Sequence, residues 1–335
     1  MRAAVAEARK ALGQTSPNPA VGALLVHAGR ILARGHHRGA GKPHAEIECL
    51  SRWKKSLPAS ATLFITMEPC STIGRTGPCT EAIIRSGIRN VVIGTIDENP
   101  RHNGRGIKRL EEAGIRVRSG VLSDECKQLN EHFNKWIVTG MPFVIAKCGM
   151  TIDGRLTRCP KDPRWITSAA ARQHAQHLRS QVDAIVVGAE TIRRDNPRLT
   201  VRGITGARQP LRIIMTRRGR LPRDANVFRD RFKDRTVIYK NKSLRSVLRD
   251  LGKQKITSVL IEGGGQLLGH ALDEGLIDKI QIYVAPLLTA GPVVAFGANG
   301  AADTSSAAHV DRIVFTKIGA DICVAGYPLH QCSKK

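Results

Sequence analysis

The sequence is poor in aromatic residues and in acidic ones. Aromatic side chains make up 4% of its 335 residues, and 28 Asp and Glu stand against 53 Lys and Arg, so the formal net charge is +25. Proteins that hold single-stranded nucleic acid stack its bases on aromatic rings. Because such rings are scarce, we interpret the basic excess as a solvated surface and expect no nucleic-acid partner.

The sequence also lacks signals for secretion or for membrane insertion. Its N-terminus does not show the charged, apolar and small-residue pattern of a signal peptide. Its longest uncharged run, 280–302, contains Pro286, Pro292 and several glycines, and would make a poor membrane span. The eight cysteines therefore predict free or metal-bound thiols, not disulfides. We expect a cytoplasmic protein without a membrane partner.

Length and pattern indicate two domains. A chain of 335 residues is long for a single domain, and the alternation of strand-like and helix-like segments restarts after residue 140. Apolar runs typical of buried strands alternate with amphipathic segments in both parts, which predicts an α/β fold for each. We expect one domain at 1–140 and a second at 141–335.

Prolines, glycines and capping residues bound the expected elements. The expected strands are a hairpin at 21–35 and runs at 61–70, 90–97, 115–122, 143–154, 183–189, 211–216, 236–240, 256–262 and 279–288. The expected helices are 1–12, 43–55, 77–87, 104–114, 123–137, 167–182, 243–254 and 265–272.

The segment PHAEIEC, 43–49, places His44 and Glu46 at the head of an expected helix. Alone, this pair is also typical of an ordinary polar helix start. Two cysteines downstream change the interpretation. Cys70 ends a strand, and Cys79 begins the next helix, where backbone N–H groups favour a thiolate. One imidazole and two thiolates are three zinc ligands that leave the fourth position open for water, so we predict a zinc site of His44, Cys70 and Cys79.

Glu46 is not needed as a zinc ligand. Two residues beyond His44, it can accept the proton of the water and deliver it to a ring nitrogen and a leaving amine. This pattern resembles the zinc nucleobase deaminases, in which His-x-Glu precedes Pro-Cys and a second cysteine. One alternative is a closed structural zinc site, but no fourth ligand is apparent nearby. Another is a zinc-stabilised binding protein without chemistry, in which Glu46 would have no role.

The spacing of the two cysteines is unusual. Eight residues separate Cys70 from Cys79, whereas the common deaminase motif has two. This insert, the segment SPNPAVG (16–22) and the segment DENP (97–100) are similar to the riboflavin-pathway deaminases. Four later segments resemble, in order, the reductase part of the bifunctional riboflavin-biosynthesis deaminase–reductases. They are KCGMTIDGR (147–155), WITS (165–168), DNPRLTVR (195–202) and IEGGG (261–265).

The resemblance implies a fold, two reactions and two cofactors. It implies an N-terminal cytidine-deaminase-like αβα domain with Zn²⁺ and a C-terminal dihydrofolate-reductase-like α/β domain with NADPH. The first reaction would be hydrolytic deamination of 2,5-diamino-6-(5-phosphoribosylamino)pyrimidin-4(3H)-one. The second would reduce the ribosyl side chain to ribityl and give 5-amino-6-(5-phosphoribitylamino)uracil. We also expect a homo-oligomer.

The resemblance also implies site residues for the second half. NADPH is expected to contact Gly149, Trp165, Thr191, Asp195, Gly264, Gly265, Gln266, Leu267, Leu268, Gly269 and His270. The substrate is expected to contact Arg179, Leu199, Arg202 and Glu262. The two arginines are suited to a phosphate monoester. The polar groups expected near the carbon that accepts the hydride are Lys147, Asp195 and Glu262.

Three points stay open from the residues themselves. The run GGGQLLG lacks the G-x-G-x-x-G spacing, so alone it is equally typical of a tight turn. Asp195 precedes Asn196–Pro197 and is also typical of a plain loop. The alternative function is a nucleic-acid (tRNA) deaminase with a basic C-terminal appendage, which the charge favours and which the cysteine spacing and the reductase-like segments oppose.

Overall fold

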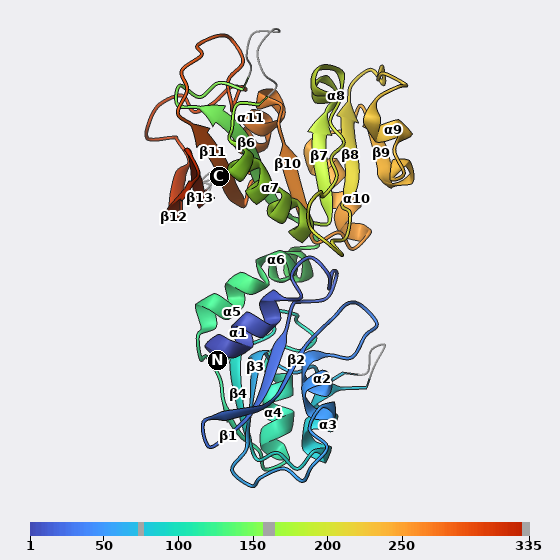
Figure 1. Ribbon diagram of the computed structural model, residues 1–335, viewed down its shortest axis with the longest axis vertical. Coiled ribbons are helices and arrows are strands. Elements are labelled where there is room, and N and C mark those ends of the chain that lie inside the picture. The colour runs from blue at the N-terminus through green and yellow to red at the C-terminus, as the bar shows by residue number, and fades with distance from the viewer. Residues whose placement is uncertain (73–76, 157–164, 330–335) are drawn as a thin grey trace. The chain divides into compact units, whose positions relative to one another are not determined.

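The computed structural model describes residues 1–72, 77–156 and 165–329. The chain divides into two compact units, Met1–Met141 and Pro142–Lys335 (Figure 1). Each unit is an α/β structure with its own sheet, as the sequence predicts. In the described part of the chain, no helix is long and apolar enough to cross a membrane.

The first unit is built on a five-stranded sheet of order β2-β1-β3-β4-β5. Its strands are β1 (Gly22–His27), β2 (Arg30–His36), β3 (Thr62–Met67), β4 (Asn90–Thr95) and β5 (Arg116–Arg118). β1 and β2 form the expected hairpin, whose turn is made by Ala28 and Gly29 with φ of 47° and 73°. Two successive left-handed residues match the twist of the flanking strands. β3, β4 and β5 run parallel.

Helices cover both faces of this sheet. They are α1 (Arg2–Arg9), α2 (Ala45–Ser51), α3 (Cys79–Arg85), α4 (Arg105–Glu112), α5 (Ser123–Leu129) and α6 (Glu131–Thr139). A Cβ added to Gly22 would lie 2.2 Å from the Ala4 carbonyl oxygen of α1, and one added to Gly35 would lie 2.4 Å from the Ala45 carbonyl oxygen of α2. Gly35 pairs with Ala23, the residue after Gly22 in β1, and successive residues of a strand face opposite sides of the sheet. Gly22 and Gly35 therefore contact α1 and α2 on opposite faces. The result is an αβα sandwich.

The helix expected at 123–137 is two helices in the structure. The chain leaves helical geometry at Asn130, where φ is −121° and ψ is 23°. The buried Asn130 side chain accepts a hydrogen bond from the Ala20 N–H at 2.7 Å and donates one to the Ala20 carbonyl at 3.0 Å. This tie to a distant segment explains the break. The helix expected at 43–55 is also shorter, because it ends at Ser51.

The second unit is built on an eight-stranded sheet of order β12-β13-β11-β6-β10-β7-β8-β9. Its strands are β6 (Phe143–Thr151), β7 (Ala184–Gly188), β8 (Leu211–Thr216), β9 (Thr236–Lys240), β10 (Ser258–Glu262), β11 (Lys279–Ala285), β12 (His309–Ile318) and β13 (Asp321–Leu329). β6 to β11 run parallel to one another, and β13 pairs antiparallel with both β11 and β12.

Helices surround the middle of this sheet. They are α7 (Ala169–Gln181), α8 (Ala189–Asp195), α9 (Asn226–Arg229), α10 (Leu244–Lys253) and α11 (Gly265–Asp273), with a short 3₁₀ turn η1 (Lys233–Arg235). Ser168 is the N-cap of α7, and Figure 1 shows α7 lying across the near face of the sheet. β10 is buried along its whole length, so both of its faces are covered. The sequence did not predict α8, β12 or β13.

Candidate active sites

In the first unit, three elements bring ligand-type side chains together. His44 is the N-cap residue of α2, Cys70 follows β3, and Cys79 is the first residue of α3. His44 Nδ1 lies 3.2 Å from Cys79 Sγ and 3.6 Å from Cys70 Sγ, and all three ligand atoms lie within 4.8 Å of one another. Two donors of a tetrahedral zinc ion are about 3.6 Å apart, given bonds of about 2.0–2.3 Å. The donor set and its spacing fit zinc.

The surroundings of this cluster favour a thiolate. The Cys79 backbone N–H donates to Cys70 Sγ at 3.4 Å. A hydrogen bond from the Cys79 thiol, with a second from the His44 imidazole, lowers the pKa of Cys70 to about 4 although burial opposes ionisation. The contact with Cys70 raises the pKa of His44 in turn. Negative charge on sulfur beside an imidazole is the environment that zinc prefers.

Glu46 lies in the first turn of α2 and is 3% exposed. Burial, and then the negative charge of Cys70, raise the pKa of Glu46 to about 7. A carboxyl group that titrates near neutrality can take up and return a proton at working pH. Within the described residues, His44, Cys70 and Cys79 form the one cluster suited to a metal, and no fourth side chain belongs to it.

A neighbouring histidine, which the sequence did not single out, supports this site. The His37 ring lies edge-on to the His44 ring, with 5.1 Å between centroids. Its Nδ1 donates to the Pro43 carbonyl at 3.0 Å, and its Nε2 accepts from the Asn18 amide at 3.1 Å. Burial lowers the pKa of His37, which agrees with a neutral ring. His37 thus fixes the turn that carries His44.

Glu68 is a second residue that the sequence analysis missed. Its buried carboxylate accepts hydrogen bonds from four backbone N–H groups at 2.8–3.2 Å. The donors are Asp97, Gly104, Gly106 and Ile107. The carboxylate thereby joins the strand end that leads to Cys70 to the DENP segment and the start of α4. Of the insert between the two cysteines, 73–76 lie outside the described residues.

The second unit has a cavity of about 590 Å³ at the carboxyl ends of β6 and β10. Ligands of open α/β sheets bind at this edge, and the volume is within the range of small-molecule sites. Ten residues expected at the site line the cavity. They are Lys147, Gly149, Trp165, Arg179, Thr191, Asp195, Leu199, Arg202, Glu262 and Gly264.

The six other expected residues, 265–270, lie along α11 and not in the cavity lining. Packing accounts for two glycines among them. A Cβ on Gly265 would lie 1.9 Å from the Val294 carbonyl oxygen, and one on Gly269 would lie 2.7 Å from the Ala298 backbone nitrogen. Gly264 differs from these, because it has a φ of 76° and turns the chain at the cavity.

The best-defined polar contact in the cavity is an ion pair between Arg179 of α7 and Glu262 of β10. Arg179 Nε and Nη2 lie 2.7 and 2.5 Å from the two carboxylate oxygens, and Nη1 donates to the Thr200 carbonyl at 3.2 Å. Burial opposes ionisation of Glu262, but the charges of Arg179 and Lys147 lower its pKa to about 2. Lys147 is the strand partner of Glu262. Glu262 is therefore ionised and paired.

The cavity contains further polar groups that the sequence analysis did not name. The Arg172 guanidinium lies 5.0 Å from the Trp165 ring centroid and donates to the Thr167 carbonyl at 2.6 Å. The Tyr283 hydroxyl bonds His174 Nδ1 at 2.8 Å, and Arg198 also lines the wall. These side chains reach the cavity through tertiary contacts, so no local sequence pattern predicts that they belong to the site.

Two family models match the chain. The cytidine and deoxycytidylate deaminase zinc-binding region matches residues 1–95 and so includes His44, Glu46 and both cysteines. The RibD C-terminal domain matches residues 142–324, which include the whole lining of the cavity. The two matches correspond to the two units of the fold.

Relatives match over the full length. The riboflavin biosynthesis protein RibD of Aquifex aeolicus is 36% identical over 97% of this chain and 96% of its own. The RibD of Escherichia coli is 37% identical over 82% of this chain and 83% of its own. The match of the second unit shows that the alternative, a tRNA deaminase with a basic appendage, is wrong.

Solved structures agree in fold. Acinetobacter baumannii RibD has a TM-score of 0.88 at 33% identity and covers 98% of each chain. A Thermotoga maritima diaminohydroxyphosphoribosylaminopyrimidine deaminase/5-amino-6-(5-phosphoribosylamino)uracil reductase has a TM-score of 0.88 at 33% identity, covering 98% of this chain and 97% of that one. With a zinc-type cluster in one unit and an arginine-rich cavity in the other, the chain belongs to the RibD family of bifunctional riboflavin-biosynthesis deaminase–reductases.

Proposed function

We propose that residues 1–140 deaminate 2,5-diamino-6-(5-phosphoribosylamino)pyrimidin-4(3H)-one on a zinc ion held by His44 Nδ1, Cys70 Sγ and Cys79 Sγ. The main support is that these three atoms lie within 4.8 Å of one another and that Glu46, two residues after His44, is buried. Zinc bound by three protein ligands polarises water and makes it a nucleophile at neutral pH. The ligand spacing and the thiolate-stabilising contacts support this assignment.

Glu46 would move the protons of this reaction. It takes one proton from the attacking water and delivers it to a ring nitrogen, and a further transfer makes the amine a leaving group. At the carbon that bears the 2-amino group, a C–O bond forms and the C–N bond breaks, so ammonia leaves. The buried position of Glu46, with a pKa of about 7, supports this cycle of uptake and release.

Cys79→Ser tests the ligand assignment. The variant is expected to lose zinc and deamination, because a serine hydroxyl is not a thiolate donor at neutral pH. Its NADPH-dependent reduction of 5-amino-6-(5-phosphoribosylamino)uracil should stay within about twofold of wild type, because the zinc ligands and the reductase cavity belong to separate compact units. Metal analysis, ammonia release and NADPH oxidation are the measurements.

Cys126→Ser is the matched control, since Cys126 is another fully buried thiol of the first unit. It should keep its zinc and both activities. A Cys79→Ser enzyme that keeps a full complement of zinc would contradict the ligand set. Loss of reduction in a folded Cys79→Ser protein would contradict the proposal that the first unit deaminates and the second unit reduces independently.

We propose that residues 141–335 reduce the deaminated product with NADPH in the cavity of the second unit. NADPH, when bound, supplies a hydride for the first carbon of the ribosyl group. As the sugar ring opens, its oxygen needs a proton, and Lys147 at the end of β6 is the cationic group suited to hold and deliver it. Glu262 is the strand partner of Lys147, and the charge of Lys147 helps to lower the pKa of Glu262, so a carboxylate lies near the proposed proton donor. Asp195, the last residue of α8, is proposed as a further polar group near the reacting carbon.

The position of each expected residue in the structure indicates whether it would contact NADPH or the phosphorylated substrate. Gly149, Trp165, Thr191 and Gly264 are proposed to contact NADPH directly, because they line the cavity. The run 265–270 would contribute backbone N–H groups at the start of α11, where a helix favours phosphate. Arg202 and Leu199 are proposed to contact the phosphorylated substrate, while Arg179 also holds Glu262.

We propose that the enzyme works in a reducing, cytoplasmic setting without nucleic-acid partners. All six cysteines in the described residues are free thiols. Two of them are needed as thiolates in the zinc cluster, which an oxidising compartment would endanger. The other two, Cys159 and Cys332, lie outside the described residues.

We propose that the enzyme is a homo-oligomer in which β12 of one copy pairs with β12 of another. β12 is the edge strand of the second sheet, and its first nine residues are exposed. It carries three consecutive apolar residues, Ile313, Val314 and Phe315, of which Phe315 is 66% exposed. Uncovered apolar edge strands pair with other chains, and a two-fold axis lets one strand pair with its own copy.

Phe315→Asp is expected to convert the oligomer into smaller species, because a buried unpaired carboxylate costs several kcal/mol. Light scattering after size-exclusion chromatography measures the mass. Ile238→Asp is the control, since Ile238 is 47% exposed on β9, the opposite edge of the same sheet. If Ile238→Asp disrupts the assembly and Phe315→Asp does not, the interface lies at β9.

A further inference from the structure

The cavity of the second unit carries a surplus of positive charge. Its lining has five basic and two acidic side chains, which are Lys147, Arg172, Arg179, Arg198, Arg202, Asp195 and Glu262. Arg179 and Glu262 neutralise each other in their bidentate pair. Of the remaining five, four are cations and one is a carboxylate. A surplus of this size matches ligands that bring phosphate groups, since a phosphate monoester carries about two negative charges.

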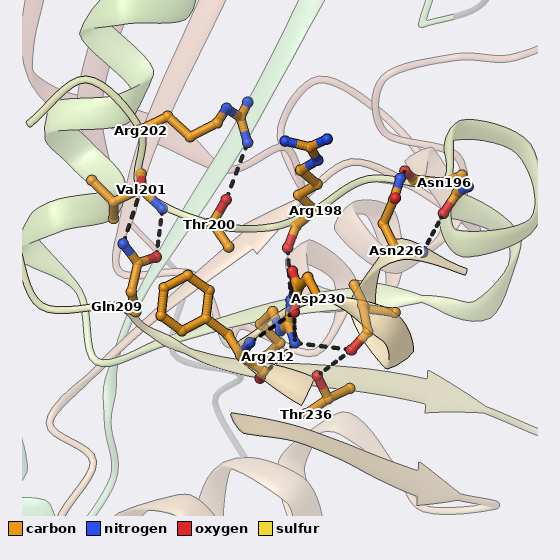
Figure 2. Close-up of polar contacts among 12 residues, drawn as sticks. Asn196, Arg198, Thr200, Val201, Arg202, Gln209, Arg212, Asn226, Asp230 and Thr236 are labelled. Atoms are coloured by element: carbon orange, nitrogen blue, oxygen red, sulfur yellow. Dashed lines mark hydrogen bonds and ion pairs between the residues drawn. The ribbon is translucent and has the colours of Figure 1, made fainter. Parts of the chain in front are cut away.

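Among these cations, Arg198 is the arginine whose guanidinium no side chain or carbonyl group of the described residues binds. In the described part of the chain, its guanidinium makes no hydrogen bond or ion pair, although it lines the cavity. Figure 2 shows its side chain extending away from Arg212, toward the same side as the Arg202 guanidinium. Arg202 is the residue already proposed to bind the phosphorylated substrate. Both residues belong to the 196–202 segment and to the lining of the cavity.

The backbone that presents these two arginines is unusual. It is the 196–202 segment, which follows α8. Asn196 and Leu199 have left-handed backbone angles, with φ of 42° and 53°, and Leu199 is buried. Left-handed geometry is unfavourable for a leucine, so surrounding contacts must hold it. Backbone strain of this kind is a feature of binding and catalytic segments.

Side chains from elsewhere bond the peptide groups of this segment (Figure 2). The Gln209 amide accepts from the Val201 N–H at 2.8 Å and donates to the Val201 carbonyl at 3.0 Å. The Asn226 amide donates to the Asn196 carbonyl at 2.7 Å. Gln176 accepts from the Arg202 N–H at 2.9 Å. The path of the segment is thus fixed before any ligand binds.

Arg212 of β8 holds the segment at Arg198 itself. Its side chain is 1% exposed, and its Nη1 donates to the Arg198 carbonyl at 3.1 Å. The same guanidinium bonds both carboxylate oxygens of Asp230 at 2.7 and 3.0 Å, and the carbonyls of Val227 and Phe232 at 2.9 and 2.6 Å. A buried charge with this many acceptors cannot shift without losing several bonds. It therefore fixes the direction of the Arg198 carbonyl, and with it the direction in which the side chain leaves the backbone.

We infer that Arg198 is a specificity-determining residue of the reductase, whose guanidinium binds a phosphate group of a ligand beside Arg202. Arg212 is its positioning residue and acts through the Arg198 carbonyl. The phosphate belongs either to the ribosyl group of the substrate or to NADPH, and the chemistry of recognition is the same for both. This inference rests on the proposed reductase function of the cavity.

Arg198→Met tests the inference directly. Steady-state rates are measured with 5-amino-6-(5-phosphoribosylamino)uracil, with its dephosphorylated riboside and with varied NADPH. Loss of a charge-assisted hydrogen bond predicts a rise of about 10- to 100-fold in one KM while kcat is retained. A rise for the phosphorylated substrate, with the kcat/KM of the riboside unchanged, assigns the phosphate to the substrate. A rise in the KM of NADPH assigns it to the cofactor, and Arg198→Lys should restore part of either loss.

Arg245→Met is the matched control, because this exposed arginine donates to the Glu274 carbonyl and lies outside the cavity lining. It should leave every KM unchanged. An Arg198→Met enzyme with unchanged KM for both phosphorylated ligands overturns the inference. Wild-type protein that fails to oxidise NADPH with the substrate would instead overturn the proposed function, so the two failures are distinguishable.

The role of Arg212 is tested by combining substitutions. If Arg212 acts through Arg198, then Arg212→Met raises the same KM, and adding Arg198→Met to it has little further effect. Fully additive effects would show that Arg212 does not position Arg198. The thermal unfolding curve of each variant, compared with that of wild type, verifies that the second unit is intact. The single substitution at Arg198 decides the main inference if Arg212→Met does not fold.

Discussion

Glu46→Gln is expected to abolish ammonia release while the protein keeps its zinc. Glutamine preserves the shape of the side chain but cannot accept and return a proton, and general acid–base groups contribute about 10²- to 10⁴-fold to rate. The ligand atoms of His44, Cys70 and Cys79 do not depend on Glu46. Reduction of already deaminated substrate should be unaffected. The measurements are metal content, ammonia release and NADPH oxidation on one preparation.

The control for this variant lies on the same helix. Glu48 is partly exposed and forms ion pairs with Arg38 and Arg52 at 2.8 and 2.6 Å. Surface pairs of this kind contribute little, so Glu48→Gln should keep both activities. If Glu46→Gln deaminates at the wild-type rate, the zinc cluster is structural and the proposed proton shuttle is wrong.

Glu262→Gln is expected to destabilise the second unit and to abolish reduction. The substitution leaves the Arg179 charge buried without its counter-charge, which typically costs 3–5 kcal/mol, on the order of 10 °C in Tm. The pKa of Glu262 gives a similar magnitude, because a fall from 4.5 to about 2 corresponds to about 3 kcal/mol at neutral pH. Thermal unfolding and NADPH oxidation measure the two effects. Glu190→Gln, at an exposed glutamate of α8, is the control.

The pH dependence of this effect has a defined sign. Because the pKa of Glu262 is lowered on folding, its stabilising contribution is complete above pH 4.5 and is lost as the pH falls toward 2. Wild type should therefore lose stability in that window more steeply than Glu262→Gln does. The double variant Arg179→Met, Glu262→Leu should recover most of the stability at neutral pH without recovering reduction. A double variant that reduces substrate normally would show that the pair serves the fold alone.

Local patterns were sufficient to predict that His44, Cys70 and Cys79 lie close together. His44, Cys70 and Cys79 stand at helix starts and a strand end, and parallel strands bring such ends to one edge of a sheet. The three ligand atoms could therefore be predicted to meet, although His44 lies 26 positions before the nearer cysteine. Glu68 could not be predicted in the same way. Its carboxylate acts on N–H groups that lie 29 to 39 positions away along the chain.

Less of the second unit could be predicted from the sequence, because several of its features depend on contacts between segments far apart in the chain. Lys147 and Glu262 end neighbouring strands, so their meeting follows from the sheet. The interpretation of the basic excess as a solvated surface fails at Arg212, which is buried inside an ion pair with Asp230. β12 was missed because charged and apolar residues follow one another in it without strict alternation, and nearly all of its residues are exposed. Such a strand has no buried face to produce the period-two pattern.

The way in which the 196–202 segment is supported has a consequence for how this enzyme can change. Arg212, Gln209 and Asp230 lie behind the wall and outside the lining of the cavity, yet they determine the shape that the wall offers. Exchanges at such hidden supports would remodel ligand preference while every residue within reach of a ligand stays the same. Evolution, or a laboratory selection, thus has routes to a new preference that an inspection of the cavity surface alone would overlook.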